Sequence, residues 1–285
     1  MAQDIFSKIQ ASEKIFTKAE RKVADYIIDS PKEALYMSIT DLAQHCGVGD
    51  TTVFRFCRTL KLDGYQDFKM MLAQSLSTQD DSSSVALSEE IKRNDSLDEV
   101  CRKLLATDIA ALNQTFSMIN EEDIHRAVEM IEKARVIHFF GVGSSGIMAQ
   151  EAKNKFSRVL PNVVFTMDSH MQAMESALLD ERDLAIAFSY SGSTKDTIDI
   201  LKRAKANKTN TICITRYAES PLTIYADITL LCGANEGPFQ GGSLSVRVAQ
   251  LYLLDVLYTE YFKRNYGTCD HNIKSTTQAI AGKLL

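Results

Sequence analysis

Short apolar runs alternate with helical stretches from residue 136 onward, and this rhythm restricts the possible folds more than any other feature. The runs do not alternate with polar residues, which is typical of strands covered on both faces; they span 136–141, 163–166, 184–189, 210–215 and 228–232. Helical periodicity separates the first four runs, over 144–159, 169–179 and 194–207. The pattern therefore predicts an α/β domain with a doubly wound parallel sheet. A last helix, expected over about 243–263, is apolar enough to be buried against this sheet or another subunit.

Hydroxyl side chains are concentrated where two of these runs end. The turn "GVGSSG" (141–146) follows the first run, and "SYSGSTKDT" (189–197) follows the third. Both turns are expected at the carboxyl edge of the sheet, where open α/β sheets bind ligands, and each leads into a helix whose first N–H groups are unpaired. A phosphate monoester suits such donors, so we predict ligand contacts from Ser144, Ser145, Ser189, Ser191, Ser193 and Thr194.

Two other interpretations of these turns stay open at this point. The spacing G-x-G-x-x-G also occurs in dinucleotide-binding folds, and Asp168 lies roughly where a ribose-binding acid would follow the second run. The same residue types also serve as ordinary helix caps and turn residues. Hydroxyl groups at two separate turns favour the phosphate interpretation over both.

Residues 1–77 show helical periodicity only, and they include two short helices joined by a glycine-bearing turn at 47–49. Capping-box patterns at Thr17–Glu20 and Ser38–Asp41 mark two helix starts, and Asp50 is expected to cap the helix after the turn. In that helix, "TTVFRFCRTL", one face is apolar and the opposite face is polar with two arginines. This is the pattern of a helix-turn-helix whose second helix enters the major groove of DNA.

The polar face of this second helix supplies the candidate DNA contacts. Arg55 has the forked side chain that reads guanine O6 and N7, while Arg58 and Lys61 are expected to contact phosphate. The full predicted set is Thr51, Thr52, Arg55, Arg58, Thr59 and Lys61. A merely solvated helix face would show the same pattern. Ten basic and ten acidic residues give 1–77 a net charge of zero, which weakens the DNA interpretation.

Composition limits the remaining possibilities. The 285 residues are enough for two domains, and the polar stretch 78–96 is expected to be the linker between domains at 1–77 and 97–285. The net charge of −5 does not indicate a membrane or nucleic-acid partner. The six cysteines lack a metal-site spacing, so we expect them to be reduced, and we expect neither a metal nor a cofactor. No signal core or membrane-spanning run is recognisable, which favours a cytoplasmic protein.

Both halves of the chain resemble one known family. Residues 1–77 resemble the N-terminal domain of the RpiR family of bacterial transcription regulators through "TKAERKVADYI" and "SITDLAQHCGVGDTTVFRFCRTLKLDGYQDFK", although that family commonly has glycine where this chain has Lys61. Residues 97–265 resemble the SIS (sugar isomerase) domain, which binds phosphosugars, through "FFGVGSSG", "DSHMQAMESALLDERDLAIAFSYSGSTKDTIDI" and "ICITRYAESPLTIYAD". The resemblance implies that the second hydroxyl turn grips phosphate and that Ser144 and Ser145 meet the sugar.

The resulting hypothesis is a transcription regulator without catalytic turnover, whose operator binding responds to a sugar phosphate. An isomerase needs a general base beside its substrate, yet the candidates His170, Glu175 and Glu236 form no recognisable arrangement. Lys195 also stands where isomerising SIS domains often carry an acid, and Glu236 is instead a candidate partner for sugar hydroxyls. A phosphosugar isomerase with an appended helical module is the alternative, and a DNA-binding architectural protein is a third. The expected partners are a palindromic DNA operator, a sugar-phosphate effector and further copies of the chain in a dimer or tetramer.

Overall fold

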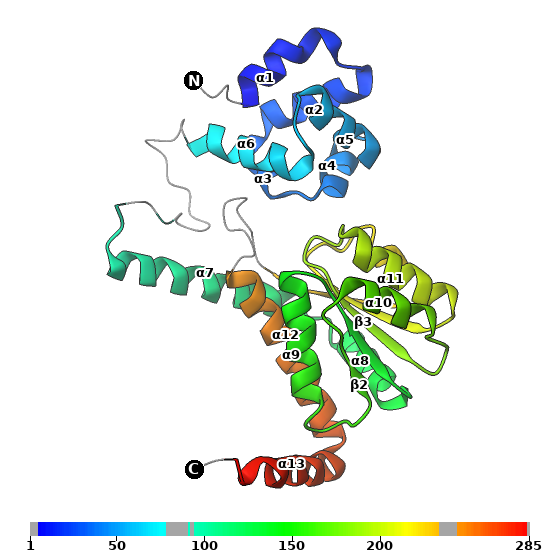
Figure 1. The fold of residues 1–285 in the computed structure, drawn as a ribbon. Coiled ribbons are helices and arrows are strands. Elements are labelled where there is room, and N and C mark those ends of the chain that lie inside the picture. The colour runs from blue at the N-terminus through cyan, green and yellow to red at the C-terminus, as the bar shows by residue number, and fades with distance from the viewer. Residues whose placement is uncertain (1–4, 78–90, 92–93, 234–243, 284–285) are drawn as a thin grey trace. The chain divides into compact units, whose positions relative to one another are not determined.

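The computed structural model describes residues 5–77, 91, 94–233 and 244–283 of the chain. These residues form two compact units that divide within one helix, between residues 107 and 108, and each unit is described by itself. Helices fill the first unit, whereas helices surround a sheet in the second (Figure 1). No described helix is both long enough and apolar enough to cross a membrane.

The first unit is all-helical, as the sequence predicts. Its elements are α1 (Ile5–Ser12), η1 (Glu13–Ile15), α2 (Lys18–Asp29), α3 (Pro31–Tyr36), α4 (Ile39–His45), α5 (Asp50–Thr59) and α6 (Tyr65–Ser77). Both predicted capping boxes form, at Thr17 with Glu20 and at Ser38 with Asp41. The core is built around Phe56, whose ring lies 5.3 Å from that of Phe16 and 6.1 Å from that of Phe68.

The start of α5 differs from the prediction by one residue. The N-cap is Gly49, and Asp50 is already the first residue of the helix, so its carboxylate does not cap the helix. That carboxylate instead accepts a hydrogen bond from the Thr40 hydroxyl at 2.9 Å. The two helices of the helix-turn-helix are therefore tied together by a side-chain bond as well as by their shared core.

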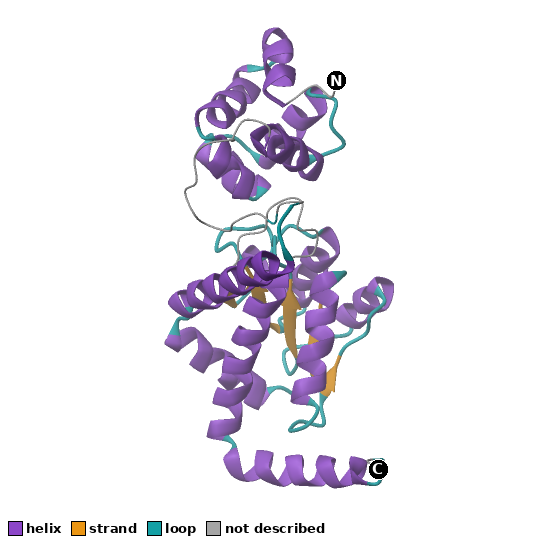
Figure 2. Cartoon of the chain, turned by 90° about the vertical axis from the view of Figure 1, so that its left-hand side faces the viewer, coloured by secondary structure: helices purple, strands orange, loops and turns teal. Residues whose placement is uncertain are grey.

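The second unit contains the predicted parallel sheet (Figure 2). Its strands are β1 (Ile137–Phe140), β2 (Val163–Val164), β3 (Leu184–Phe188), β4 (Asn210–Thr215) and β5 (Ile228–Leu231). All pairings are parallel, and the strand order is β2-β1-β3-β4-β5. Every residue of β3, the central strand, is buried, which explains why its sequence is apolar without alternation.

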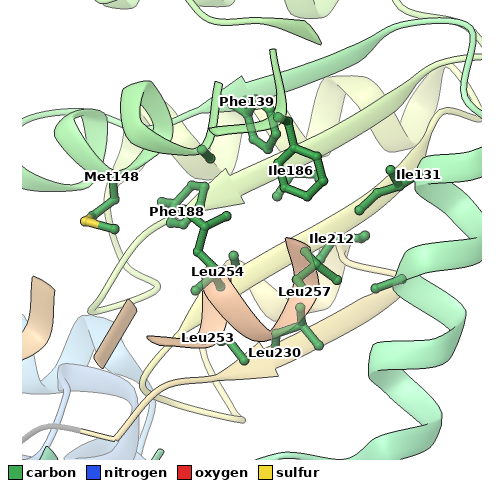
Figure 3. Packing of buried hydrophobic residues seen from close by; sticks show 14 of the residues in the cluster. Ile131, Phe139, Met148, Ile186, Phe188, Ile212, Leu230, Leu253, Leu254 and Leu257 are labelled. Atoms are coloured by element: carbon green, nitrogen blue, oxygen red, sulfur yellow. The ribbon is translucent and has the colours of Figure 1, made fainter. Parts of the chain in front are cut away.

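Helices cover both faces of this sheet. The helical elements are α7 (Leu97–Met118, shared with the first unit), α8 (Glu121–Lys133), α9 (Ser144–Phe156), α10 (Ser169–Ala177), α11 (Lys195–Ala206), η2 (Thr223–Tyr225), α12 (Leu244–Arg264) and α13 (Tyr266–Ala281). One core joins the sheet to α8, α9 and α12, and a smaller core joins the opposite face to α11 and to Leu179, which follows α10. Figure 3 shows the larger core, in which Ile186, Phe188 and Ile212 from the strands meet the leucines of α12. The sequence pattern did not predict α13.

Candidate functional site

The two hydroxyl-rich turns leave the sheet from neighbouring strands. β1 and β3 pair in parallel, with Phe140 opposite Ala187, so the turns that follow them start side by side at the carboxyl edge. The chain passes from β1 outward to β2 and then back across β1 to β3, which makes this pair the topological switch point of the sheet. Open α/β sheets bind ligands in the crevice at such a point.

The first turn brings Ser144 and Ser145 to the start of α9. Gly143 precedes the helix with φ of 59°, and no side chain caps the helix, so its first N–H groups are not consumed by a cap. Both serines are half-buried. The backbone is tight here, because a Cβ on Gly141 would come within 2.6 Å of the carbonyl oxygen of Ser145.

Gln172 on α10 holds this first turn in place, and sequence reasoning missed it. Its side chain is completely buried. The Gly141 N–H donates to Gln172 Oε1 at 3.1 Å, while Gln172 Nε2 donates to the carbonyl oxygens of Gly141 and Thr166, each at 2.8 Å. A glutamine in a helix carries no sequence signal for this role, since the bond joins residues 31 positions apart.

The second turn brings Ser189, Ser191, Ser193 and Thr194 to the start of α11. Gly192 has a φ of 61°, and a Cβ there would lie 2.1 Å from Ser220 Oγ, so the turn depends on glycine. The Ser193 N–H donates to Ser191 Oγ at 3.2 Å, which fixes the turn internally. Thr194 is the N-cap of α11 but makes no side-chain cap bond. The first N–H groups of α11 therefore face the same turn as the hydroxyls.

Buried hydroxyls next to the second turn are a further feature that the sequence did not indicate. Thr197 Oγ1, in the first turn of α11, and Ser220 Oγ, against Gly192, have no hydrogen-bond partner among the described residues. Buried polar groups normally have partners. These two hydroxyls add to the polar character of the turn.

The structure places two of the three candidate catalytic bases, Glu175 and His170. Glu175 lies with its Oε2 3.8 Å from Nδ1 of His138 on β1, and its other oxygen accepts a hydrogen bond from Thr166. Burial lowers the pKa of His138, against the opposing effect of the Glu175 carboxylate. His170 is exposed on α10. Glu236 lies outside the described residues, so the structure does not place it.

Asp168, which the dinucleotide interpretation required, has a structural role in this chain. Its Oδ1 accepts a hydrogen bond from the Met171 N–H at 2.9 Å and thereby caps α10. Within the described ranges, no three His, Cys, Asp or Glu side chains are grouped in a way that would hold a metal ion. The six cysteines are free thiols, and five of them are buried.

The exposed face of α5 differs from the predicted set of DNA-contacting residues. Thr51, Arg55 and Arg58 are exposed, as expected for a nucleic-acid interface. Thr52 is only 8% exposed, however, and the half-buried Thr59 donates its hydroxyl hydrogen to Glu20 Oε1 at 3.0 Å. These two threonines therefore do not belong to the exposed face, and Thr59 bonds to α2.

The rotation of α5 explains the difference. Successive residues turn by about 100°, so Thr52 and Thr59 lie on the flank of the helix, about a quarter-turn from Thr51. Phe54 lies closer to the centre of the exposed face and is 42% exposed. Sequence reasoning missed Phe54, because an aromatic residue in an amphipathic helix is normally assigned to the buried face.

Glu20 is the acceptor that fixes this flank of α5. Its carboxylate accepts hydrogen bonds from the Thr17 N–H at 2.9 Å and the Thr17 hydroxyl at 2.7 Å, in addition to the bond from Thr59. Burial alone would raise the pKa of Glu20, but these hydrogen bonds outweigh burial, and the pKa lies below its usual value. The carboxylate is thus ionised in the folded unit and joins α2 to α5.

Lys61 adopts a backbone conformation that favours glycine. Its φ is 59°, in the left-handed region, directly after the C-cap Leu60. The Lys61 N–H donates to the Arg58 carbonyl oxygen at 2.9 Å, and the Leu62 N–H donates to that of Cys57 at 3.0 Å. These two bonds form a Schellman motif. The Lys61 side chain is exposed.

A helix-turn-helix unit together with a doubly wound unit whose switch point is lined by hydroxyls defines a two-domain transcription regulator. Comparison with known proteins supports this class. The helix-turn-helix domain of the rpiR family matches residues 3–79, and the SIS domain matches residues 130–260. The chain therefore belongs to the RpiR family of helix-turn-helix transcription regulators, and the enzyme alternative is not favoured.

Individual relatives support the same assignment over the whole chain. An HTH-type transcriptional regulator of Haemophilus influenzae is 36% identical over 255 residues, which cover 90% of this chain and 88% of that one. The HTH-type transcriptional regulator HexR of Escherichia coli is 31% identical over 277 residues, 97% and 94% of the two chains. The solved structure of Vibrio vulnificus NanR, complexed with ManNAc-6P, is similar with a TM-score of 0.85 and 27% identity, over 99% of both chains.

Proposed function

We propose that this regulator senses a sugar phosphate, which binds at the two hydroxyl-rich turns and changes the affinity of the protein for its operator. The observation that carries the proposal is the side-by-side placement of the turns after β1 and β3, each leading into a helix without a side-chain cap. Unpaired N–H groups and a helix dipole attract an anion. The similarity to NanR, which was solved with ManNAc-6P, supports a ligand of the same class.

Within this site, the phosphate is assigned to the second turn and the sugar to the first. Ser189, Ser191, Ser193 and Thr194 offer hydroxyl groups around the N-terminus of α11, and Gly192 allows a close approach of the backbone. Ser144 and Ser145 lie at the start of α9, where neutral hydroxyls suit a polyol. Glu236, as a partner for sugar hydroxyls, stays a sequence-based prediction.

The proposed DNA contacts lie on the exposed face of α5. Arg55 reads a guanine, while Thr51, Arg58 and Lys61 contact bases or phosphates. A single zero-charge helical unit binds DNA weakly, so we propose that copies of the chain pair and contact a palindromic operator in the cytoplasm. The effector acts through its different affinities for arrangements that space the two helix-turn-helix units differently.

The test is a thermal-unfolding titration of the full chain with hexose and N-acetylhexosamine 6-phosphates, using the unphosphorylated sugars and inorganic phosphate as controls. A ligand at 100 times its Kd adds about 2.7 kcal/mol of stability. The same compounds are then tested for release or recruitment of a DNA duplex selected by the protein from a random-sequence pool. Each compound is also incubated with the protein, and chemical interconversion would support the isomerase alternative.

A double variant locates the effector site. Ser191→Ala with Thr194→Ala removes two hydroxyls while retaining the turn glycine, so the stabilisation by the sugar phosphate should disappear. Binding of the selected duplex should persist, because the substitutions lie outside the helix-turn-helix unit. If no compound in the panel changes either thermal stability or DNA binding, the sensor proposal is wrong. If the double variant responds like the wild type, the site has been placed incorrectly.

A further inference from the structure

Phe54 is an exposed aromatic side chain on the proposed DNA-binding face, about 60° around the helix from Thr51. Its exposed fraction is 42%, whereas Phe56, two residues further along α5, is completely buried. Burial of a phenylalanine side chain is favourable, and much of that stabilisation is not realised at position 54 in the free chain. A single exposed apolar residue is common, so the position of this residue carries the argument rather than its exposure alone.

The neighbours of Phe54 show that the ring shares its surface with the arginines. The guanidinium carbon of Arg58, one helical turn later, lies 5.4 Å from the centroid of the Phe54 ring. Arg58 also forms an ion pair with Asp63 at 3.5 Å, but the Asp63 side chain is fully exposed, so this pair is weak. On the other side, a methyl group placed on Gly64 would lie 3.9 Å from the ring. The ring is thus supported by Arg58 and the α5–α6 turn.

The major groove offers one apolar group that suits such a ring. Thymine alone presents a methyl group there, and phenylalanine is among the residues that contact it. Phe54 and Arg55 are adjacent in sequence and point about 100° apart on the helix surface, so they face different base edges. Both lie within the exposed arc centred on Thr51.

We propose that Phe54 contacts the 5-methyl group of a thymine in each operator half-site and thereby specifies that base pair, next to the one read by Arg55. This inference rests on the proposed DNA-binding role of α5. It adds a direct apolar readout of thymine to the hydrogen-bonded readout of guanine. In the complex, Arg58 exchanges its weak ion pair with Asp63 for a contact with a backbone phosphate while it stays over the Phe54 ring.

The test uses the duplex selected by the full wild-type chain and replaces each thymine, one at a time, by deoxyuridine. This substitution removes only the methyl group and preserves base pairing. For the wild type, one position in each half-site should lose affinity by about fourfold, the effect of one buried methyl group. The Phe54→Ala variant should bind the unmodified duplex more weakly, and deoxyuridine at that same position should have no further effect.

The matched control is Ile28→Ala, which truncates another exposed apolar side chain of the same unit, 53% exposed on α2. Its deoxyuridine profile should equal that of the wild type. If Phe54→Ala keeps the wild-type profile while binding the duplex, the thymine contact is refuted and the regulator function stands. If the wild type selects no duplex at all, the DNA-binding proposal itself fails. Circular dichroism of each variant verifies that the helical unit is folded.

Discussion

Replacing Lys61 by glycine is expected to stabilise the helical unit and, at the same time, to weaken its binding to DNA. Lys61 adopts a φ of 59°, and the left-handed conformation costs an L-residue roughly 1–2 kcal/mol. Glycine removes that cost, but it also increases the conformational entropy of the unfolded chain, which reduces the gain in stability by about 0.4–1 kcal/mol. The net gain is therefore about 1 kcal/mol, which corresponds to about 4–8 °C in Tm for a unit of this size.

The second unit supplies a matched control for this substitution. Lys208, with a φ of 62°, follows the C-cap of α11 in the same way. The Lys208 N–H donates to the carbonyl oxygen of Lys205 and the Thr209 N–H donates to that of Ala204, each at 3.0 Å. Lys208→Gly should therefore stabilise its own unit by a similar amount. It should leave DNA binding unchanged, because it lies outside the helix-turn-helix unit.

Differential scanning calorimetry of the full chain measures the two stabilities, and titration of the selected duplex at several salt concentrations measures the DNA contact. Loss of one phosphate contact reduces the slope of log affinity against log salt by about 1. If both glycine variants are no more stable than the wild type, the reasoning from left-handed strain is wrong. If Lys61→Gly is more stable but keeps the wild-type salt slope, Lys61 does not contact phosphate.

Three other substitutions test separate parts of the structure. Gly192→Ala should lower the unfolding free energy of the second unit by about 3 kcal/mol in urea, because the new Cβ would lie 2.1 Å from Ser220 Oγ at a positive φ. The control is Gly267→Ala, which has open space around it and should be neutral or stabilising. Arg55→Ala should weaken binding of the selected duplex by about 1–3 kcal/mol in a fluorescence-anisotropy titration while leaving Tm unchanged, and wild-type affinity would rule out its base contact. The lowered pKa of Glu20 gives stability that is complete above the ordinary glutamate pKa and is lost as the pH falls through the folded value. Glu20→Gln should therefore reduce the acid-induced loss of unfolding free energy, and an unchanged pH profile would contradict the hydrogen-bonded carboxylate.

Much of this architecture follows from local sequence patterns. The five predicted strands appear within a few residues of their expected bounds, with β2 ending earlier, and both capping boxes form where the residues indicate. The hydroxyl turns after β1 and β3 are likewise visible in the sequence. These features are local: hydrophobic periodicity and cap chemistry depend on residues a few positions apart, so the chain specifies them without reference to distant partners.

Contacts between distant segments decided the rest. The sequence alone assigned Thr52 and Thr59 to the exposed face of α5, but in the folded unit Thr52 is buried, Thr59 bonds to Glu20 on α2, and Phe54 is exposed. Likewise, Gln172 was unremarkable in its helix until the fold placed it against Gly141. A periodic pattern fixes which residues share a helix face, whereas the rotation of that helix against its neighbours is set by side-chain packing and hydrogen bonds across the chain. The sequence by itself thus determined most of the elements and the chemistry of their ends, and the tertiary structure alone decided which side chains of α5 are exposed and which residues hold the hydroxyl-rich turns in place.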